Sequence, residues 1–548
     1  MCRIGRSNSF ASEKRNGAKG AEYNCLLVKQ KLPPKVRVPL LRDRNWWLFC
    51  LGILTLKFIL FAVDPLPKFW GGDSNTYIWT AVSGGIPEDR SYLYGYVIRW
   101  VALSTSSLMS LLILQVFAGA VIAIVCGWIC LRIFHLPPYA AFGVGLLCCL
   151  DPLELYWERA IMTETLSLLF YALLLQRSFV YLKRKRIQEL IWIQLIGVLM
   201  IGFRMSYLLL VYVVAVTLPI LAFVFHDNST SEKRQVRYGL KGPAFAGVTR
   251  PLGHIMLALV TMFVLHDAYQ RVTGSLSHRK PKYLYSTGID LLAFWAPALR
   301  PTDADDERLA GLIRNGGEFK IEDINYRTAQ LHMKGFLIDR LRQMEPNKAR
   351  QDSLGRRTAL HALLRNPLAI GNLALQTYAE FWRVGARSWA QIEVPTTGSF
   401  TEKEIAKLGL VDRFHQVITL LDAPQPLTFS GWYYLAMSWY YYILLLSPAI
   451  MGLLIMLSRG PDQKTAFLFL NIIVLFVTIL VFAGRPEVRY LQPISLLTLL
   501  TLGVATGSLL GRTNSLLRNR TVTNLPARAS SDLPGSNNAR SKSHLGSD

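Results

Sequence analysis

The stretch LIWIQLIGVLMIGFRMSYLLLVYVVAVTLPILAFVF, residues 190–225, forms one apolar region that is too long for a single membrane crossing. As one helix, its 36 residues would reach about 54 Å at 1.5 Å per residue. The hydrocarbon core of a bilayer is only about 30 Å thick. The chain must therefore bend back, most simply at Arg204-Met205-Ser206, and we predict two spanning helices joined there.

Similar apolar runs recur along the chain, which is 51% hydrophobic and only 18% charged. Its mean hydropathy of +0.28 is a membrane signal, because a soluble protein of this length would normally carry more charge. We predict an all-α polytopic membrane protein with about ten transmembrane helices. Besides the two in 190–225, the expected spans are 46–63, 107–133, 139–150, 161–182, 254–265, 433–457, 466–483 and 491–510.

The net charge of +24 is concentrated beside the apolar runs, in residues 3–44, 183–186, 233–250 and the C-terminal tail. Cytoplasmic loops of membrane proteins are enriched in Lys and Arg, so these segments are expected in the cytoplasm. The loops 64–106, 151–160, 204–206, 267–430 and 484–490 then fall outside. A basic chain can also bind nucleic acid, but the dispersed charge and the lack of a reader motif exclude that partner here.

This pattern predicts five parts in a multi-pass protein of the inner (plasma) membrane. They are a disordered, basic cytoplasmic arm (1–45), an N-terminal transmembrane module (46–266) with a catalytic first outer loop (64–106), an extracytoplasmic and mainly helical soluble domain (267–430), C-terminal transmembrane helices (431–511) and a disordered cytoplasmic tail (512–548). The seven cysteines show neither a disulfide framework nor a zinc motif.

The first candidate motif, Gly71-Gly72-Asp73-Ser74-Asn75-Thr76-Tyr77, directly follows the first predicted span. The two glycines allow close approach of the backbone. Asp73 would then be a single carboxylate at the membrane surface, suited to act as a general base. The alternative is that Asp73 only caps a short helix that starts at Ser74.

Two further motifs lie on the same predicted face. The first of these motifs lies around the start of the fourth span and contains Asp151, Glu154 and Glu164. A charge at Glu164, inside an apolar helix, needs a partner or a wet cavity. The alternative is that the helix dipole alone favours a carboxylate at this N-terminal position. Arg485 and Arg489 stand between the last two spans, and with Arg204 they suit a phosphate, the alternative being lipid headgroups. If the carboxylates of Asp73, Asp151, Glu154 and Glu164 converge, they would suit magnesium or manganese, but no cofactor is predicted with certainty.

At these residues the chain resembles the GT-C class of membrane glycosyltransferases, in particular bacterial protein mannosyltransferases, aminoarabinose transferases and rhizobial core-sugar transferases. The resemblance covers residues 46–510 and rests on Gly72-Asp73-Ser74-x-x-Tyr77, Asp151-Pro152 with Thr163-Glu164, the Arg204 break, and Arg485-x-x-x-Arg489-Tyr490 with Pro493. One departure is Ser74, because protein mannosyltransferases carry an Asp-Glu pair in this loop. That departure makes a protein acceptor less expected.

The resemblance implies inverting transfer of a sugar from a polyprenyl-phosphate donor to a glycan, glycolipid or protein acceptor of the cell envelope. Asp73 would be catalytic, Arg204, Arg485 and Arg489 would bind the donor phosphate, and Tyr77 and Tyr490 would support the site. The segment 267–430 would cover the site and help to bind the acceptor, with residues 278–280 and Trp295 as candidates. The competing readings are a ligase or polymerase of lipid-linked glycans and a lipid-linked sugar flippase or transporter.

Overall fold

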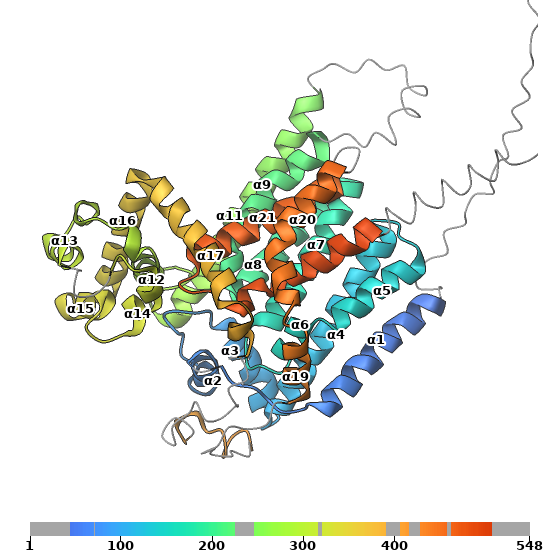
Figure 1. The fold of residues 1–548 in the computed structure, drawn as a ribbon, viewed down its shortest axis with the longest axis horizontal. Helices are drawn as coiled ribbons and strands as arrows, with labels where there is room; N and C mark the ends of the chain where they lie inside the picture. The colour runs from blue at the N-terminus through green and yellow to red at the C-terminus, as the bar shows by residue number, and fades with distance from the viewer. Residues whose placement is uncertain are drawn as a thin grey trace, which may run out of the picture. The chain divides into compact units, whose positions relative to one another are not determined.

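The structure is a computed structural model that describes residues 44–70, 72–224, 246–315, 321–390, 406–415, 428–457 and 462–506 (Figure 1). The predicted disordered segments, the N-terminal arm up to residue 43 and the C-terminal tail, lie outside the described residues. From Phe49 onward the described chain belongs to one compact unit, and all contacts given below lie within it.

The described residues are helical and contain no strand, only an isolated parallel bridge between Lys68 and Ala160. Seven helices are long and apolar enough to cross a membrane. They are α1 (Arg44–Val63), α4 (Leu108–Arg132), α7 (Glu164–Arg184), α9 with its preceding turn (Met205–Phe223), most of α11 (Pro251–Ser277), α21 (Gln463–Phe482) and the last helix (Val488–Thr506). The protein is therefore an all-α, multi-pass membrane protein.

Three of the predicted spans are not among these seven. One is a broken helix, α19 (Phe429–Ala436) followed by α20 (Tyr440–Leu457), which bends by 51° and would make an eighth span. The other two are α5 (Pro138–Cys149) and α8 (Ile187–Phe203), apolar helices of 12 and 17 residues. By length the count is thus seven or eight, because these two are shorter than the roughly 20 residues that a full crossing needs.

The turn predicted at residues 204–206 is present. Helix α8 ends at Phe203, and Arg204 has an extended backbone, with φ −146° and ψ 110°. A single 3-10 turn (Met205–Tyr207) then leads into α9 (Leu208–Val224). Both α8 and α9 pack against each other and against α11 (Ala246–Ser277), which is longer than the predicted span at 254–265.

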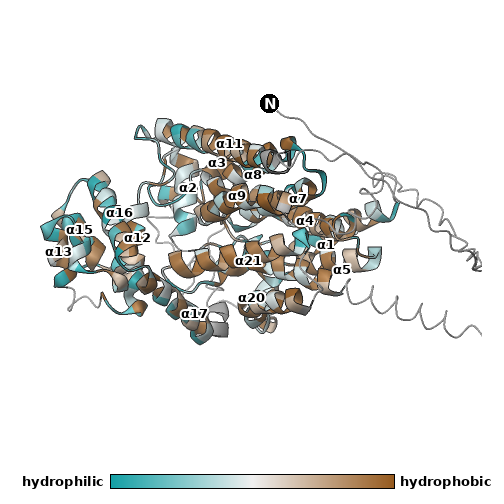
Figure 2. Cartoon of the chain, turned by 90° about the horizontal axis from the view of Figure 1, so that it is seen from above, coloured by the Kyte–Doolittle hydropathy of each residue, from teal (hydrophilic) through white to brown (hydrophobic). Residues whose placement is uncertain are grey.

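The apolar helices form one bundle, which Figure 2 shows as a continuous brown region. Helix α4 packs between α5 and α7, α7 packs against α8, and α9 packs against α21. The segment after α1, predicted as a polar loop, contains three short helices: α2 (Asp73–Ser83), α3 (Leu93–Ile98) and a π-helical turn (Arg99–Leu103). These helices and α6 (Pro152–Trp157) bring polar residues to one end of the bundle.

The segment between α11 and α19 has its own small core beside the bundle. Its helices are α12 (Thr287–Phe294), α13 (Glu307–Arg314), α14 (Arg327–His332), α15 (Leu337–Met344), α16 (Lys348–Arg365) and α17 (Pro367–Ala390). Buried Leu292, Leu309 and Ile338 belong to this core. In Figure 2, helices α13, α15 and α16 carry teal, hydrophilic residues among the brown ones. Helix α17 packs against α20 and α21, so it connects the segment to the membrane helices.

Candidate active site

Backbone hydrogen bonds hold the segment after α1 beside the segment before α7. The N–H of Lys68 donates to the carbonyl of Arg159 at 2.7 Å, and the N–H of Ile161 donates to the carbonyl of Lys68 at 2.8 Å. The buried hydroxyl of Ser74 donates to the carbonyl of Ile161 at 3.0 Å and accepts from the N–H of Trp70 at 2.8 Å. These contacts fix the start of α2 near the start of α7.

Helix α2 begins at Asp73 itself, and its N-cap is Gly72. Gly72 has φ 76°, in the left-handed region that favours glycine, so the sequence turns sharply into the helix. No side-chain hydrogen bond caps this helix. Asp73 therefore does not cap this helix through its side chain. Its carboxylate instead pairs with Arg90 and Arg489.

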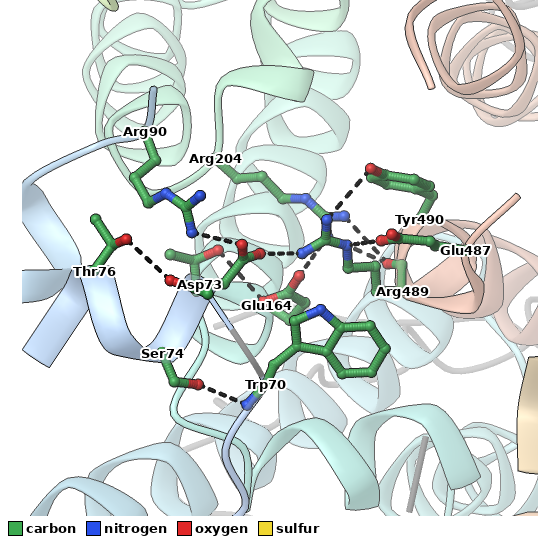
Figure 3. Close-up of polar contacts among 12 residues, drawn as sticks. Trp70, Asp73, Ser74, Thr76, Arg90, Glu164, Arg204, Glu487, Arg489 and Tyr490 are labelled. Carbon is green, nitrogen blue, oxygen red and sulfur yellow. Dashed lines mark hydrogen bonds and ion pairs between the residues drawn. The ribbon is translucent and has the colours of Figure 1, made fainter. Parts of the chain in front are cut away.

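Those partners are two arginines from distant parts of the chain. Arg90 Nη1 lies 2.5 Å from Asp73 Oδ1, and Arg489 Nη1 pairs with Asp73 Oδ2 (Figure 3). Burial by itself raises the pKa of Asp73, but Arg489 and Arg90 outweigh it and hold that pKa below its ordinary value. The segment after α1 and the segment that opens the last spanning helix thus meet at Asp73, a contact that the sequence alone does not predict.

Arg204 joins this group from the turn between α8 and α9. Its two terminal nitrogens both donate to the carbonyl of Arg489 at 3.3 Å, and its guanidinium lies 5.5 Å from the centre of the Tyr490 ring. Arg204 Nη1 is also 3.7 Å from Glu164 Oε1 at the start of α7. The buried Glu164 thus has the cationic partner that a charge in an apolar helix requires.

Arg489 is held on several sides. It forms an ion pair with Glu487, and its guanidinium lies 5.9 Å from the Trp70 ring and 5.2 Å from the Tyr490 ring. Cation–π contacts of this kind favour a fixed position for the charge. Figure 3 shows the resulting row, in which the Asp73 carboxylate lies between two guanidinium groups.

These side chains line a cavity of about 290 Å³. Its walls include Asp73, Tyr77, Arg90, Glu164, Arg204, Arg489 and Tyr490, together with Asp290 of α12 and His332 of α14. The guanidinium of Arg90 covers the Tyr77 ring at 5.8 Å. The cavity therefore combines three guanidiniums with the carboxylates of Asp73, Asp89, Glu164 and Asp290, so it offers donors to an anionic group and carboxylates that can accept a proton.

Asp151 and Glu154 do not reach this cavity. Asp151 accepts from the N–H of Leu153 at 3.0 Å and from the hydroxyl of Ser495 at 2.5 Å, within the helix packing. Glu154 accepts from Gln492 Nε2 at 2.5 Å. The four carboxylates that could have formed a metal site therefore do not converge, and no group of three or more His, Cys, Asp or Glu side chains in the described chain could hold a metal ion.

Arg485 also lies outside the cavity lining. Its side chain is 55% exposed and pairs with Glu487, whose carboxylate also pairs with Arg489. Arg485 is thus connected to Arg489 only through this shared carboxylate. Trp295, an acceptor candidate from the sequence, is buried and donates to the carbonyl of Val481 at 2.9 Å, which is a packing role.

Four ionisable residues of the cavity lining were not among the predicted site residues: Asp89, Arg90, Asp290 and His332. Asp89 and Arg90 had a signal, because Glu88-Asp89-Arg90 is a charged run in the loop predicted to be the first outer one. Asp290 and His332 had none, since they come from separate helices more than 100 residues beyond that loop. Burial, with a further contribution from Asp89, raises the pKa of Asp290 to about 7, while burial and the nearby Arg485 lower the pKa of His332.

No protein-family model matches the chain, and no curated protein matches it at a significant level.

Proposed function

We propose that the chain is a glycosyltransferase of the inner (plasma) membrane that moves a sugar from a polyprenyl-phosphate donor to a cell-envelope acceptor. The transfer takes place at the outer face and inverts the anomeric carbon. The observation that carries the proposal is the Asp73 carboxylate beside Arg204 and Arg489 in one cavity at the end of an apolar helix bundle.

The donor phosphate takes the place between Arg204 and Arg489. Arg offers a planar fork of donors that matches phosphate oxygens. A smaller cavity of about 60 Å³ shares Arg204 and Tyr490 with the main one and continues along the apolar residues Leu475, Ile479 and Phe482 of α21. A phosphate at the arginines could therefore direct the first carbons of its lipid tail between the spanning helices α9 and α21.

Asp73 is the general base in this proposal. The acceptor hydroxyl gives its proton to Asp73 while its oxygen attacks the anomeric carbon from the side opposite the phosphate. The bond from that carbon to the phosphate oxygen breaks, and polyprenyl phosphate leaves with the electron pair. Arg204 and Arg489 stabilise the developing negative charge, as preorganised cations do.

The ion pairs of Asp73 are compatible with that role. Without a donor, Arg489 neutralises Asp73. A bound phosphate competes for the same guanidinium, so Asp73 loses part of its compensation and its affinity for a proton rises. Donor binding would thus turn a weak base into a stronger one.

The test uses purified full-length protein, a panel of radiolabelled polyprenyl-phosphate sugars and cell-envelope extract. Label should move to an acceptor, and Asp73→Asn should reduce the transfer by about 10²- to 10⁴-fold, the usual contribution of a general base. The matched control is Asp267→Asn, because Asp267 is exposed, pairs with Arg271 and does not line the cavity.

Transfer of label to no acceptor across the whole donor panel would contradict the proposal. A mild effect of Asp73→Asn, with transfer intact, would favour a ligase or polymerase that relies on other loop residues. Movement of the intact donor across the membrane without transfer would favour a flippase.

A further inference from the structure

A second and larger cavity of about 1270 Å³ adjoins the cavity of Asp73. The two share Asp89, Asp290, Leu331 and His332 as lining residues, so the two cavities are adjacent and these four side chains form a common wall. We call the larger one the outer cleft. Its walls come from residues 76–89, 278–290 and 331–351, which join the first loop to the segment after α11.

The outer cleft has a basic wall. Its cationic side chains are Arg279, Lys280, Lys282, Arg342 and Lys348, against the acids Glu88, Asp89 and Asp290. Two of the nine histidines of the chain, His278 and His332, also line the cleft. The cleft therefore carries more positive than negative groups.

Local pairing leaves part of this charge uncompensated. The carboxylate of Glu88 forms ion pairs with two cations at once, Arg279 at 2.8 Å and Lys348 at 3.1 Å. Within the described chain, neither Lys280 nor Arg342 forms an ion pair with an acid. Positive groups of this kind, on the wall of a cleft, attract anions and raise their local concentration.

The size of the cleft and its aromatic lining suit a saccharide chain. Pockets for single small molecules usually measure about 300–1,000 Å³, so this cleft has room for several sugar units. Trp79 and Tyr285 line it, and the guanidinium of Arg279 lies 5.1 Å from the centre of the Tyr285 ring. Aromatic walls with a few placed charges are typical of sites that fix the orientation of a ligand.

We propose that the outer cleft binds the acceptor, and that this acceptor is an acidic glycan, with carboxylate or phosphate groups on its sugars. This inference rests on the proposed transferase function. Lys280 and Arg342 bind the acidic groups, while the shared wall at Asp290 and His332 admits the reacting hydroxyl to the cavity of Asp73. The charge of the wall thus selects the acceptor, and the arginines of the inner cavity select the donor.

The test measures binding without catalysis, with detergent-solubilised full-length protein and fluorescent oligosaccharides. The probes are hexagalacturonate, phosphorylated maltohexaose and neutral maltohexaose. We expect the acidic probes to bind more tightly than the neutral one, with an affinity that falls as salt is added, since salt screens exposed charges. A preference for one acidic probe identifies carboxylate or phosphate as the recognised group.

The double variant Lys280→Glu/Arg342→Glu replaces two cations of the wall by acids. It should weaken binding of the acidic probes by on the order of tenfold or more, which corresponds to about 1.4 kcal/mol. The matched control is Arg314→Glu, an exposed arginine of α13 that lines neither cavity. Because Asp73→Asn should leave this binding intact, loss of transfer and loss of acceptor binding are separable.

Equal binding of the neutral and acidic probes would overturn the inference, even if transfer is observed. So would full binding of the acidic probes by the double variant, provided that its melting temperature matches that of the wild type. If the protein binds a single-stranded oligonucleotide or anionic vesicles but does not bind the acidic oligosaccharides, the inference is also overturned.

Discussion

Arg489 pairs through Nη1 with Oδ2 of Asp73, across 416 positions of sequence. The pair joins the start of α2 to the beginning of the last spanning helix. The short helix that follows the first apolar helix and the start of the last apolar helix thus each contribute one charge to the same cavity. The two groups are only partly exposed, at 17% for Arg489 and 21% for Asp73, so a competing anion can reach them.

Arg489→Gln should lower the rate of transfer more than Arg489→Lys does. Loss of one preorganised donor to a developing charge typically costs about 10²- to 10³-fold in kcat. Lysine keeps the charge but not the planar fork, so it should recover only part of the rate. The measurement is kcat and KM for the donor with purified variants.

The control for this prediction is Arg485→Gln. The sequence pairs Arg485 with Arg489 as equal phosphate ligands, whereas the structure leaves Arg485 exposed beside Glu487 and outside the cavity lining. Its replacement should therefore change kcat much less than that of Arg489. A loss as large as that of Arg489→Gln would show that Arg485 moves into the site when the donor binds.

Much of the fold follows from residue patterns. The turn at Arg204 is predictable because an apolar run of this length cannot cross a bilayer once without bending. The exact number of spans is not, because α5 and α8 are apolar but short, and hydropathy alone does not separate a short span from a buried helix.

The site is predictable only in part, for a related reason. Asp73, Arg204 and Arg489 lie in segments that follow or open apolar helices, where side chains of opposite charge can meet. Asp151 and Glu154 satisfy the same rule, but Ser495 and Gln492 of the last helix bind them instead. No sequence pattern states which polar residues of two packed helices will face each other.

The structure gives a local reason for serine at position 74. Its buried hydroxyl bonds to Ile161 and Trp70, so position 74 faces the helix packing and not the cavity. A second carboxylate there would lie among these backbone groups. A carboxylate at position 73 without a second one at position 74 is therefore consistent with the local packing.

Sidedness can be tested by cysteine labelling in intact cells. A cysteine at Lys280, on the outer cleft, should react with a membrane-impermeant maleimide, while one at exposed Arg186 should not. The five native cysteines of the described chain are buried, which limits the background. Labelling of Arg186→Cys, with Lys280→Cys protected, would invert the topology and place the Asp73 cavity in the cytoplasm.

Asp290 should make stability depend on pH near neutrality. Burial raises its pKa to about 7, Asp89 and Asp352 add to the shift, and Ser286 and Arg90 oppose it. A carboxyl with a raised pKa stabilises the folded state fully at pH values below its ordinary pKa of about 4, and this contribution is lost as pH rises through about 7.

Asp290→Asn removes that titration. The melting temperature of the wild type should fall relative to that of the variant as the pH rises from about 5 to about 8, measured by tryptophan fluorescence in detergent. Parallel curves for the two proteins would show that Asp290 keeps an ordinary pKa. Asp73, whose pKa is lowered, contributes stability that is lost only when pH falls below its ordinary value.

A buried ion pair away from the site should govern the stability of the bundle. Lys57 of α1 pairs with Glu158, both are fully buried, and Arg159 Nη1 lies 3.1 Å from the second oxygen of Glu158. Glu158→Gln leaves the Lys57 charge without a full partner in an apolar setting. Removal of one partner of such a pair usually costs about 3–5 kcal/mol.

The double variant Lys57→Met/Glu158→Gln should recover much of this loss, because it also removes the charge that the single variant leaves behind. The pair Asp267–Arg271 is the control: both side chains are more than half exposed, and Asp267→Asn should cost no more than about 1 kcal/mol. Unfolding in denaturant measures all of these variants. If Glu158→Gln is as mild as Asp267→Asn, water reaches Lys57, and the charge does not depend on its partner.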